Sequence, residues 1–135
     1  MSAKFDGRLP EVKAAETVLI VEGEKDVETA LRVGLPGPSW TATTSLGPAE
    51  WLSIYAESLR GKHVVICPDT DRRGQLYLRQ IVRDLEGKVA TLCWAKLPPG
   101  QKDLSAWVEQ GATKEQVVEL LRGAQPIDCQ HLPDM

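Results

Sequence analysis

The sequence predicts an α/β fold with a mostly parallel sheet of about four strands and helices on both faces. Two observations support this fold class. Uninterrupted apolar runs at residues 17–21 and 63–67 are rich in β-branched residues, as in strands that are buried on both faces. Segments with the apolar spacing of helices alternate with the strands along the chain, and this alternation is typical of right-handed crossovers between parallel strands.

The first half of the chain predicts two strands and two helices. The strand at residues 17–21 is followed by a helix over 25–33, which Gly34 ends as a C′ residue. A weaker strand is expected over 39–43. A second helix is expected over about 48–59, where a proline lies near the first turn.

The second half repeats the pattern. The strand at residues 63–67 precedes a helix over 72–85, whose apolar residues recur with the spacing i, i+3, i+4, i+7. A fourth strand is expected over 88–94. Two short helices, over about 103–110 and 113–122, complete the predicted order β-α-β-α-β-α-β-α-α.

The length of 135 residues is that of a single domain with its own core. We expect an N-terminal arm over residues 1–16, a folded domain over 17–123 and a loosely attached tail over 124–135. The sequence has no apolar run long enough to cross a bilayer, and its three cysteines form no C-x-x-C pair. These features predict a cytoplasmic protein that does not bind membranes.

The formal net charge of −3 limits how the chain can bind nucleic acid. Proteins that bind nucleic acid tightly by themselves are usually basic, because contacts with phosphates supply much of the affinity. We therefore expect only weak binding of DNA or RNA by this chain, through a metal ion or beside a more basic partner.

Carboxylates follow two of the predicted strands at the points where these strands end. Glu22 and Glu24 follow the first strand, and Asp69 and Asp71 follow the third. Ligands bind at the carboxyl ends of the strands in an open parallel sheet, so these side chains are candidates for one site. Carboxylate oxygens suit Mg²⁺ or Mn²⁺. An alternative for Asp71 is a purely structural role as the N-cap of the helix over 72–85.

These residues resemble the two signature motifs of the TOPRIM domain. The motifs are VEGEKD at residues 21–26 and CPDTDRRG at residues 67–74, and each follows a predicted strand. TOPRIM domains occur in primases, topoisomerases, some nucleases and recombination proteins. The resemblance covers about residues 17–122 and is greatest to the TOPRIM segment of bacterial and phage primases and primase–helicases. It implies the Rossmann-like TOPRIM fold.

The resemblance also implies roles for individual residues. Glu22 matches a glutamate that acts as a metal ligand or as a general acid or base. Asp69 and Asp71 match a metal-binding D-x-D pair, and Asp103 matches an additional acidic position of primases. Thr70 replaces the asparagine often found between the two aspartates, which changes a local hydrogen bond. The implied cofactor is Mg²⁺ or Mn²⁺.

Basic residues near the two motifs are candidates for contacts with phosphate groups. They are Lys25, Arg72, Arg73, Arg79 and Arg83. Three of the arginines fall on one face of the helix over 72–85. The alternative is a solvated helix face on which the arginines pair with nearby acidic residues.

Three functions are compatible with the sequence. The first is a metal-dependent module for nucleotidyl transfer in a DNA primase or primase–helicase, working with other domains or subunits of that machine. The second is a separate TOPRIM nuclease that cleaves DNA or RNA phosphodiesters. The third is a non-catalytic module that docks on a replication partner. The sequence contains neither a cysteine–histidine cluster nor a P-loop, which complete primases of this kind often have. We therefore expect a fragment, a subunit or a free-standing TOPRIM protein.

Overall fold

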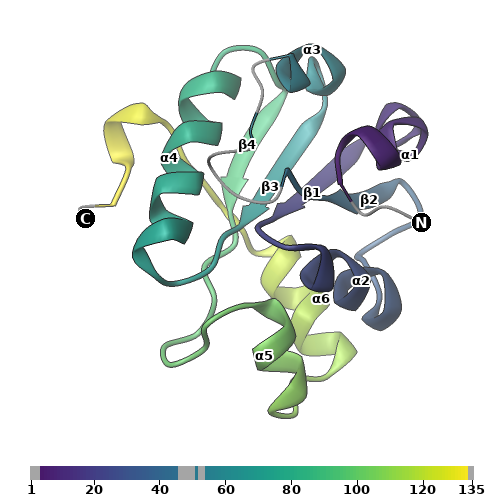
Figure 1. Cartoon of the computed structure of the whole chain (residues 1–135), viewed down its shortest axis with the longest axis vertical. Coiled ribbons are helices and arrows are strands. Elements are labelled where there is room, and N and C mark those ends of the chain that lie inside the picture. Colours follow the sequence, from purple (N-terminus) through teal and green to yellow (C-terminus); the bar gives the residue numbers. More distant parts are fainter. Residues whose placement is uncertain (1–3, 46–50, 52–53, 134–135) are drawn as a thin grey trace.

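A computed structural model describes residues 4–45, 51 and 54–133, and shows an α/β domain (Figure 1). Within these residues the sheet has five strands in the order β2-β1-β3-β4-β5. The strands are β1 (Thr17–Val21), β2 (Trp40–Thr43), β3 (His63–Cys67), β4 (Thr91–Trp94) and β5 (Gln125–Pro126). The first four are parallel, and only β5 is antiparallel to its neighbour. The predicted TOPRIM fold class, a mostly parallel sheet with helices on both faces, is confirmed.

Helices cover both faces of this sheet (Figure 1). The helices are α1 (Leu9–Ala14), α2 (Glu24–Val33), α3 (Tyr55–Leu59), α4 (Arg72–Leu85), α5 (Leu104–Glu109) and α6 (Lys114–Arg122). Two short 3-10 helices, η1 (Asp6–Arg8) and η3 (Cys129–His131), lie near the two ends of the chain. Helices α1, α3 and α4 pack on one face, and α2, α5 and α6 pack on the other.

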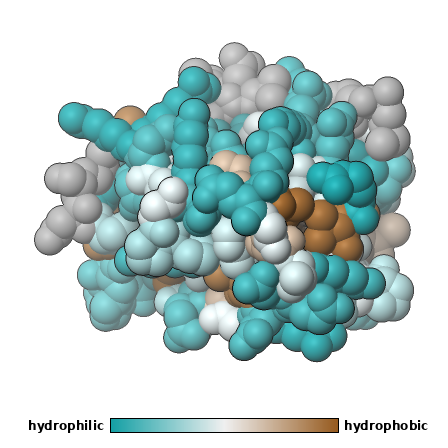
Figure 2. Space-filling view, turned by 90° about the horizontal axis from the view of Figure 1, so that it is seen from below, coloured by the Kyte–Doolittle hydropathy of each residue, from teal (hydrophilic) through white to brown (hydrophobic). Residues whose placement is uncertain are grey.

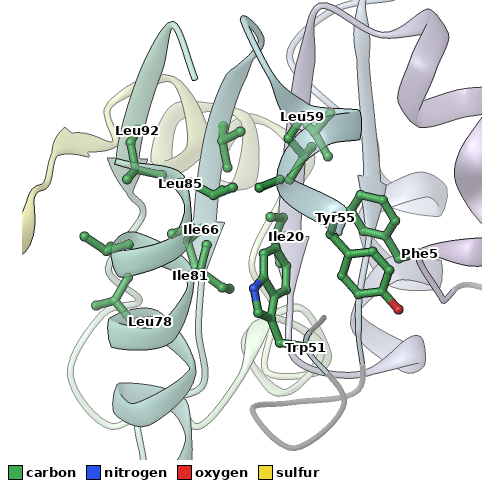
Figure 3. Packing of buried hydrophobic residues seen from close by; sticks show 14 of the residues in the cluster. Phe5, Ile20, Trp51, Tyr55, Leu59, Ile66, Leu78, Ile81, Leu85 and Leu92 are labelled. Carbon is green, nitrogen blue, oxygen red and sulfur yellow. The ribbon is translucent and has the colours of Figure 1, made fainter. Parts of the chain in front are cut away.

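The two faces form two separate hydrophobic clusters because side chains alternate along each strand. In β1, Val18 and Ile20 belong to the cluster beneath α4, whereas Leu19 and Val21 belong to the cluster beneath α2. All five residues of β1 are buried, which explains why its sequence is a continuous apolar run rather than an alternating one. Figure 3 shows the first cluster, with Ile20 between α4 and the aromatic side chains.

Three aromatic side chains close the end of this first cluster (Figure 3). The rings of Phe5 and Tyr55 are stacked with their centres 4.1 Å apart, and Trp51 meets the Tyr55 ring edge-on at 5.3 Å. The Trp51 indole also donates a hydrogen bond to Asp84 of α4. Residues that we expected to form an N-terminal arm therefore contribute to the core.

The strand order places a topological switch point at the carboxyl edge of the sheet, between β1 and β3. The chain leaves β1 for β2 on one side and then crosses to β3 on the other side, so the connections diverge at this point. Val21, the last residue of β1, pairs with Cys67, the last residue of β3. The two segments that carry the acidic residues therefore leave the sheet side by side, at the same edge.

Residues 125–127, in the segment that we expected to be a loosely attached tail, contact the sheet. Gln125 and Pro126 pair with β4, and the Ile127 side chain is only 7% exposed. The Ile127 amide donates a hydrogen bond to the carbonyl of Leu92 at 3.0 Å. Two prolines and the lack of periodicity hid a short edge strand, because a proline is tolerated at such an edge. This pairing makes the sheet one strand larger than predicted.

The other elements differ from prediction mainly at their ends. The fourth strand covers residues 91–94, because residues 88–90 form the turn that leads into it. The first part of the helix predicted over 48–59 lies outside the described residues, and its last turn is α3. The proposed boundaries at residues 16 and 123 stay a prediction.

No helix in the described part of the chain has both the length and the apolar character required to span a bilayer.

We expect that Ile127→Ala destabilises the domain by about 2–5 kcal/mol, the usual cost of truncating a buried isoleucine. Gln125→Ala, two residues earlier on the exposed strand β5, is a matched control and should change stability by less than about 0.5 kcal/mol. Urea unfolding monitored by circular dichroism measures the free energy of unfolding of both variants. Equal, small effects would indicate that the segment is loosely attached in solution.

Candidate metal centre

Glu22 follows β1 directly and lies in the short turn before α2. Its side chain is half-buried, and one carboxylate oxygen is buried. Thr44, at the end of the neighbouring β2, donates a hydrogen bond from its hydroxyl to the Glu22 carbonyl at 2.7 Å. This bond fixes the backbone at the point where the carboxylate leaves the sheet.

Asp69 and Asp71 lie in the turn between β3 and α4. Asp71 is the N-cap of α4 and accepts a hydrogen bond from the Gly74 amide at 2.8 Å. Gly74 is required here because the first turn of α4 lies directly against Asp69. A β-carbon at position 74 would be 1.9 Å from the Asp69 carbonyl oxygen.

The structure brings Glu22, Asp69 and Asp71 together. One carboxylate oxygen of each residue lies within 4.8 Å of the others. The two sequence motifs thus meet at one edge of the sheet, although 47 residues separate Glu22 from Asp69. The capping role of Asp71 and its place in this group are compatible, because a carboxylate has two oxygens and several lone pairs.

Asp103 belongs to a second group of carboxylates, which consists of Asp26, Asp69 and Asp103. Their ligand atoms also lie within 4.8 Å of one another. Asp103 is the N-cap of α5 and accepts a hydrogen bond from the Ala106 amide at 2.7 Å. Asp69 is common to both groups, so the two groups adjoin at this side chain.

Asp26 is a site residue that the sequence analysis missed. It lies within the first motif but received no role, since an acidic residue in the first turn of a helix is common. The side chain is 6% exposed, which is rare for an aspartate that does not serve a partner or a ligand. The available signal was its spacing of four residues from Ala30, which places it on the buried side of α2.

Ser105 holds Asp26 in place. Its amide and its hydroxyl both donate to Asp26 Oδ1, at 3.0 and 2.6 Å. The Ser105 hydroxyl also lies 2.8 Å from that of Thr29, one turn further along α2. These bonds join α2 to α5 beside the second carboxylate group and leave the other oxygen of Asp26 available for a ligand.

The loop that carries Asp103 is tied to the loop that carries Asp69. The Thr70 amide donates to the Lys102 carbonyl at 2.9 Å, and the Thr70 hydroxyl donates to the Gln101 carbonyl at 2.9 Å. Thr70 thus joins the two loops through both its amide and its hydroxyl. Its effect is to fix the distance between the two loops that supply acidic residues.

Burial and neighbouring negative charge both act on Asp69. Burial is the larger cause and the adjacent Glu22 is the next, and together with the other acids they raise the pKa of Asp69 to about 8. Burial also raises the pKa of Asp26, against the lowering effect of the Ser105 hydrogen bonds. Without a cation, Asp69 therefore keeps its proton to a higher pH than an ordinary aspartate does.

Two buried oxygens test whether the residues suit a metal ion. Glu22 Oε1 and Asp69 Oδ1 are inaccessible to solvent and have no hydrogen-bond partner among the residues that the structure describes. A buried acceptor without a partner is unfavourable unless a ligand or a proton shared by the two carboxyl groups satisfies it. The neighbouring atoms that could bind a metal ion are also carboxylate oxygens, which Mg²⁺ and Mn²⁺ prefer as ligands. The residues therefore fit the cofactor that the sequence predicts.

The five basic residues singled out in the sequence differ in their surroundings. Lys25 is exposed and forms an ion pair with Glu109 at 2.8 Å. Arg72, Arg73 and Arg83 are exposed on α4, whereas Arg79 is half-buried. The Arg79 guanidinium donates a hydrogen bond to the carbonyl of Pro133 in the C-terminal segment. Arg79, the middle one of the three arginines predicted on one face of this helix, is therefore in contact with the C-terminal segment.

Nearby acidic residues have partners other than these arginines. Asp84 accepts from Trp51, and Glu86 accepts from the Cys129 amide at 3.2 Å. Figure 2, which views the molecule from the side where α5 lies in Figure 1, shows a mainly hydrophilic face with an apolar area on its right.

The parallel sheet with acids after β1 and β3 defines a TOPRIM-type α/β domain. The sequence is 30% identical over 119 residues to the DNA primase DnaG of Thermofilum pendens, and the match covers 88% of this chain and 24% of the relative. The DNA primase DnaG of Methanococcus aeolicus is also 30% identical over 119 residues, which is 88% of this chain and 22% of the relative. No protein-family model matches the chain.

A solved structure of the DnaG primase catalytic domain bound to ssDNA has the same fold. Its TM-score is 0.56 at 23% sequence identity, and the match covers 87% of this chain and 38% of that chain. The chain is thus a TOPRIM domain of the primase-like type. It spans about a quarter of the length of the curated relatives it matches.

We expect Gly74→Ala to destabilise the domain by about 3 kcal/mol, the upper part of the range for overpacking, because backbone atoms must move. Glycine-to-alanine changes in helices are otherwise neutral or stabilising. Gly37→Ala is the control, since its β-carbon would meet nothing closer than 3.9 Å. Thermal unfolding compares the two variants. A stable Gly74→Ala variant would show that α4 does not lie this close to Asp69.

The raised pKa of Asp69 predicts how stability depends on pH in metal-free buffer. The folded state holds this proton up to about pH 8, whereas the unfolded chain releases it near pH 4. Stability should therefore fall as the pH rises from about 4 through about 8. Asp69→Asn should remove much of this fall, whereas Asp6→Asn, at an exposed position in η1, should keep it. Urea unfolding in EDTA from pH 4 to pH 9 measures the difference, and identical profiles for all three proteins would contradict it.

Proposed function

We propose that this chain is the metal-binding TOPRIM module of a primase-type nucleotidyltransferase that acts in DNA replication. The observation that carries the proposal is the meeting of two carboxylate groups at Asp69, in a domain similar in sequence to DnaG primases. Glu22, Asp69 and Asp71 would hold one Mg²⁺ or Mn²⁺ ion. Asp26, Asp69 and Asp103 would hold a second.

The ions would neutralise and orient phosphate oxygens, which is what divalent cations supply in phosphoryl and nucleotidyl transfer. The chain's own residues would position these ions. Asp71 and Asp103 are held as helix N-caps, and Asp26 is held by Ser105. Glu22 has one buried oxygen without a partner and is the candidate acid or base, because its carboxylate lies beside those of Asp69 and Asp71.

Nucleic acid is the proposed substrate, and the exposed basic residues support this. Arg72 and Arg73 immediately follow the metal-binding motif, and Arg83 lies three turns further along the same helix. Lys25 would contact phosphate after leaving Glu109, because an exposed ion pair of this kind contributes little to stability. Binding by the chain alone should be weak because the formal net charge is −3. The similar primase domain is described as bound to ssDNA.

We also propose that other primase or helicase domains complete the enzyme. Synthesis requires two nucleotides and a template to be aligned, and positioning supplies a large part of the acceleration in such reactions. The acidic centre positions ions, whereas further protein surface must select the nucleotides. The isolated chain should therefore make little or no primer.

A nuclease is the second candidate function, and the position of Glu22 beside the carboxylate groups favours it over a non-catalytic docking module. Hydrolysis requires only water and one held strand. Nicking that depends on Mg²⁺ or Mn²⁺ and disappears in Glu22→Gln and Asp69→Asn would support the nuclease. Template-directed primers made by the pure chain would contradict the modular role.

Metal binding is tested most directly by thermal unfolding with increasing Mg²⁺ or Mn²⁺. At about 100 times the dissociation constant, a bound ion should stabilise the wild type by about 2.7 kcal/mol. Asp69→Asn should lose nearly all of this metal-induced stabilisation, because Asp69 belongs to both carboxylate groups. Asp71→Asn and Asp103→Asn should each retain part of it. Asp6→Asn is the control. Equal metal-induced shifts in the wild type and Asp69→Asn would refute the centre.

A further inference from the structure

Tyr77 carries a buried hydroxyl group on α4, about one turn after Gly74. The side chain is 0% exposed and belongs to the cluster beneath α4. A phenylalanine would fill the same apolar space, so packing alone does not account for the hydroxyl. A buried hydroxyl is unfavourable unless it is hydrogen-bonded. The presence of a tyrosine at this position is therefore explained by the partners of its hydroxyl.

The Tyr77 hydroxyl is bonded to the two residues that follow β2. The Ser45 amide donates to it at 3.2 Å, and the Ser45 hydroxyl donates to it at 3.0 Å. The Thr44 hydroxyl forms a further hydrogen bond with it. Because β1 lies between β2 and β3 in the sheet, and α4 follows β3, these bonds connect segments that are not neighbours in the sheet.

The number of protons gives the direction of the remaining bonds. A tyrosine hydroxyl has one proton to donate and two lone pairs. Both Ser45 groups donate to this hydroxyl, so its own proton is left for the Thr44 oxygen. Thr44 in turn donates its single hydroxyl proton to the Glu22 carbonyl at 2.7 Å. A chain of hydrogen bonds thus runs from Tyr77 through Thr44 to the backbone of Glu22, and bonds in such a chain strengthen one another.

We propose that Tyr77 is a positioning residue for Glu22, because its hydroxyl fixes the backbone from which the Glu22 carboxylate reaches Asp69 and Asp71. This inference rests on the proposed metal-binding function and adds a residue that lies outside both sequence motifs. Tyr77 links α4, which begins directly after Asp71, to the turn that carries Glu22. The hydroxyl therefore holds the two parts of the first carboxylate group at a constant separation without touching an ion.

The electrostatics of the phenol agree with this placement. Burial is the main cause that raises the pKa of Tyr77, and the negative charge of Glu22 raises it further, against the lowering effect of the Ser45 and Thr44 hydrogen bonds. The phenol therefore stays neutral at physiological pH and keeps the proton that the chain of hydrogen bonds requires. The charge of Glu22 also lies near enough to act on the phenol.

The test measures Mn²⁺ binding by the whole chain with isothermal titration calorimetry and compares Tyr77→Phe with the wild type. Loss of the hydroxyl should weaken Mn²⁺ binding about tenfold, the lower end of the range for residues that support a metal ligand without touching the ion. Ile81→Val is the matched control, because it trims another fully buried side chain of α4 and leaves the hydrogen bonds intact. Its thermal midpoint should fall, whereas its affinity for Mn²⁺ should equal that of the wild type.

Thr44→Val breaks the same chain of hydrogen bonds one step nearer to Glu22. This variant should weaken Mn²⁺ binding at least as much as Tyr77→Phe does. The double variant should lose little more affinity than Thr44→Val alone, because both changes interrupt one network and their effects are not additive. If Tyr77→Phe does not fold, Thr44→Val decides the question, and wild-type affinity in that variant would overturn the inference.

A metal-free measurement separates this inference from the proposed function. The Glu22 carbonyl and the Gly23 amide belong to one peptide group, so nuclear magnetic resonance of that amide reports the bond that Thr44 donates. In buffer with EDTA, Tyr77→Phe should shift the Gly23 amide resonance. The amide of Gly123, at the end of α6, should stay unchanged.

Each outcome decides one of the two proposals. A wild type that binds no Mn²⁺ would contradict the proposed function, and the Gly23 amide would then decide alone whether Tyr77 fixes the Glu22 backbone. Wild-type affinity in a folded Tyr77→Phe protein, or an unshifted Gly23 amide, would overturn the inference and leave the metal centre intact. Equal losses of affinity in Tyr77→Phe and Ile81→Val would also overturn it, because any disturbance of α4 would then have the same effect.

Discussion

Repulsion between carboxylates around Asp69 is the constraint on which the rest of the structure depends. Two unit charges about 4 Å apart repel by roughly 4 kcal/mol at an effective dielectric constant of about 20. Asp69 has such neighbours in two groups, whose ligand atoms lie within 4.8 Å of one another. A helix N-cap contributes only about 1 kcal/mol. The capping bonds of Asp71 and Asp103 therefore cannot offset this repulsion, and a proton or a cation must do so.

The domain supports this unfavourable centre with rigid surroundings. Each acidic residue is fixed by an element that folds for other reasons: Glu22 by the end of β1, Asp71 by α4 and Asp103 by α5. Thr70 then ties the β3 loop to the loop that precedes α5. Because the acids cannot move apart easily, the raised pKa of Asp69 is a direct consequence of the fold. A site built in this way would exchange a proton for a metal ion without a large rearrangement.

The fold was predictable wherever one physical requirement dominated a segment. Fully buried strands require continuous apolar runs, so β1 and β3 were placed with their exact limits of residues 17–21 and 63–67. The C-terminal strand β5 was not predictable, because a two-residue edge strand containing proline has no pattern of its own. Its position depends on tertiary contacts, chiefly the burial of Ile127 against the sheet.

The candidate site follows the same rule. Glu22, Asp69 and Asp71 were predictable because each follows a strand, and parallel strands end at one edge. Asp26 was not, because its burial depends on α5, which is distant in sequence and supplies Ser105. The partners of Tyr77 were equally hidden. They follow β2 along the chain, whereas the apolar spacing of α4 indicates only that the ring is buried.

The distribution of charge gives a reason why the metal and the basic residues must act together. The chain is negative overall, and its most buried acidic residues lie at the place where phosphate is proposed to bind. Arginines on the exposed surface of α4 attract a phosphate backbone only over about a Debye length, roughly 8 Å at physiological salt. Within that distance the carboxylates would repel it. A divalent ion at Asp69 reverses the local charge, so the same acids that exclude phosphate in the metal-free protein would hold it once an ion is bound.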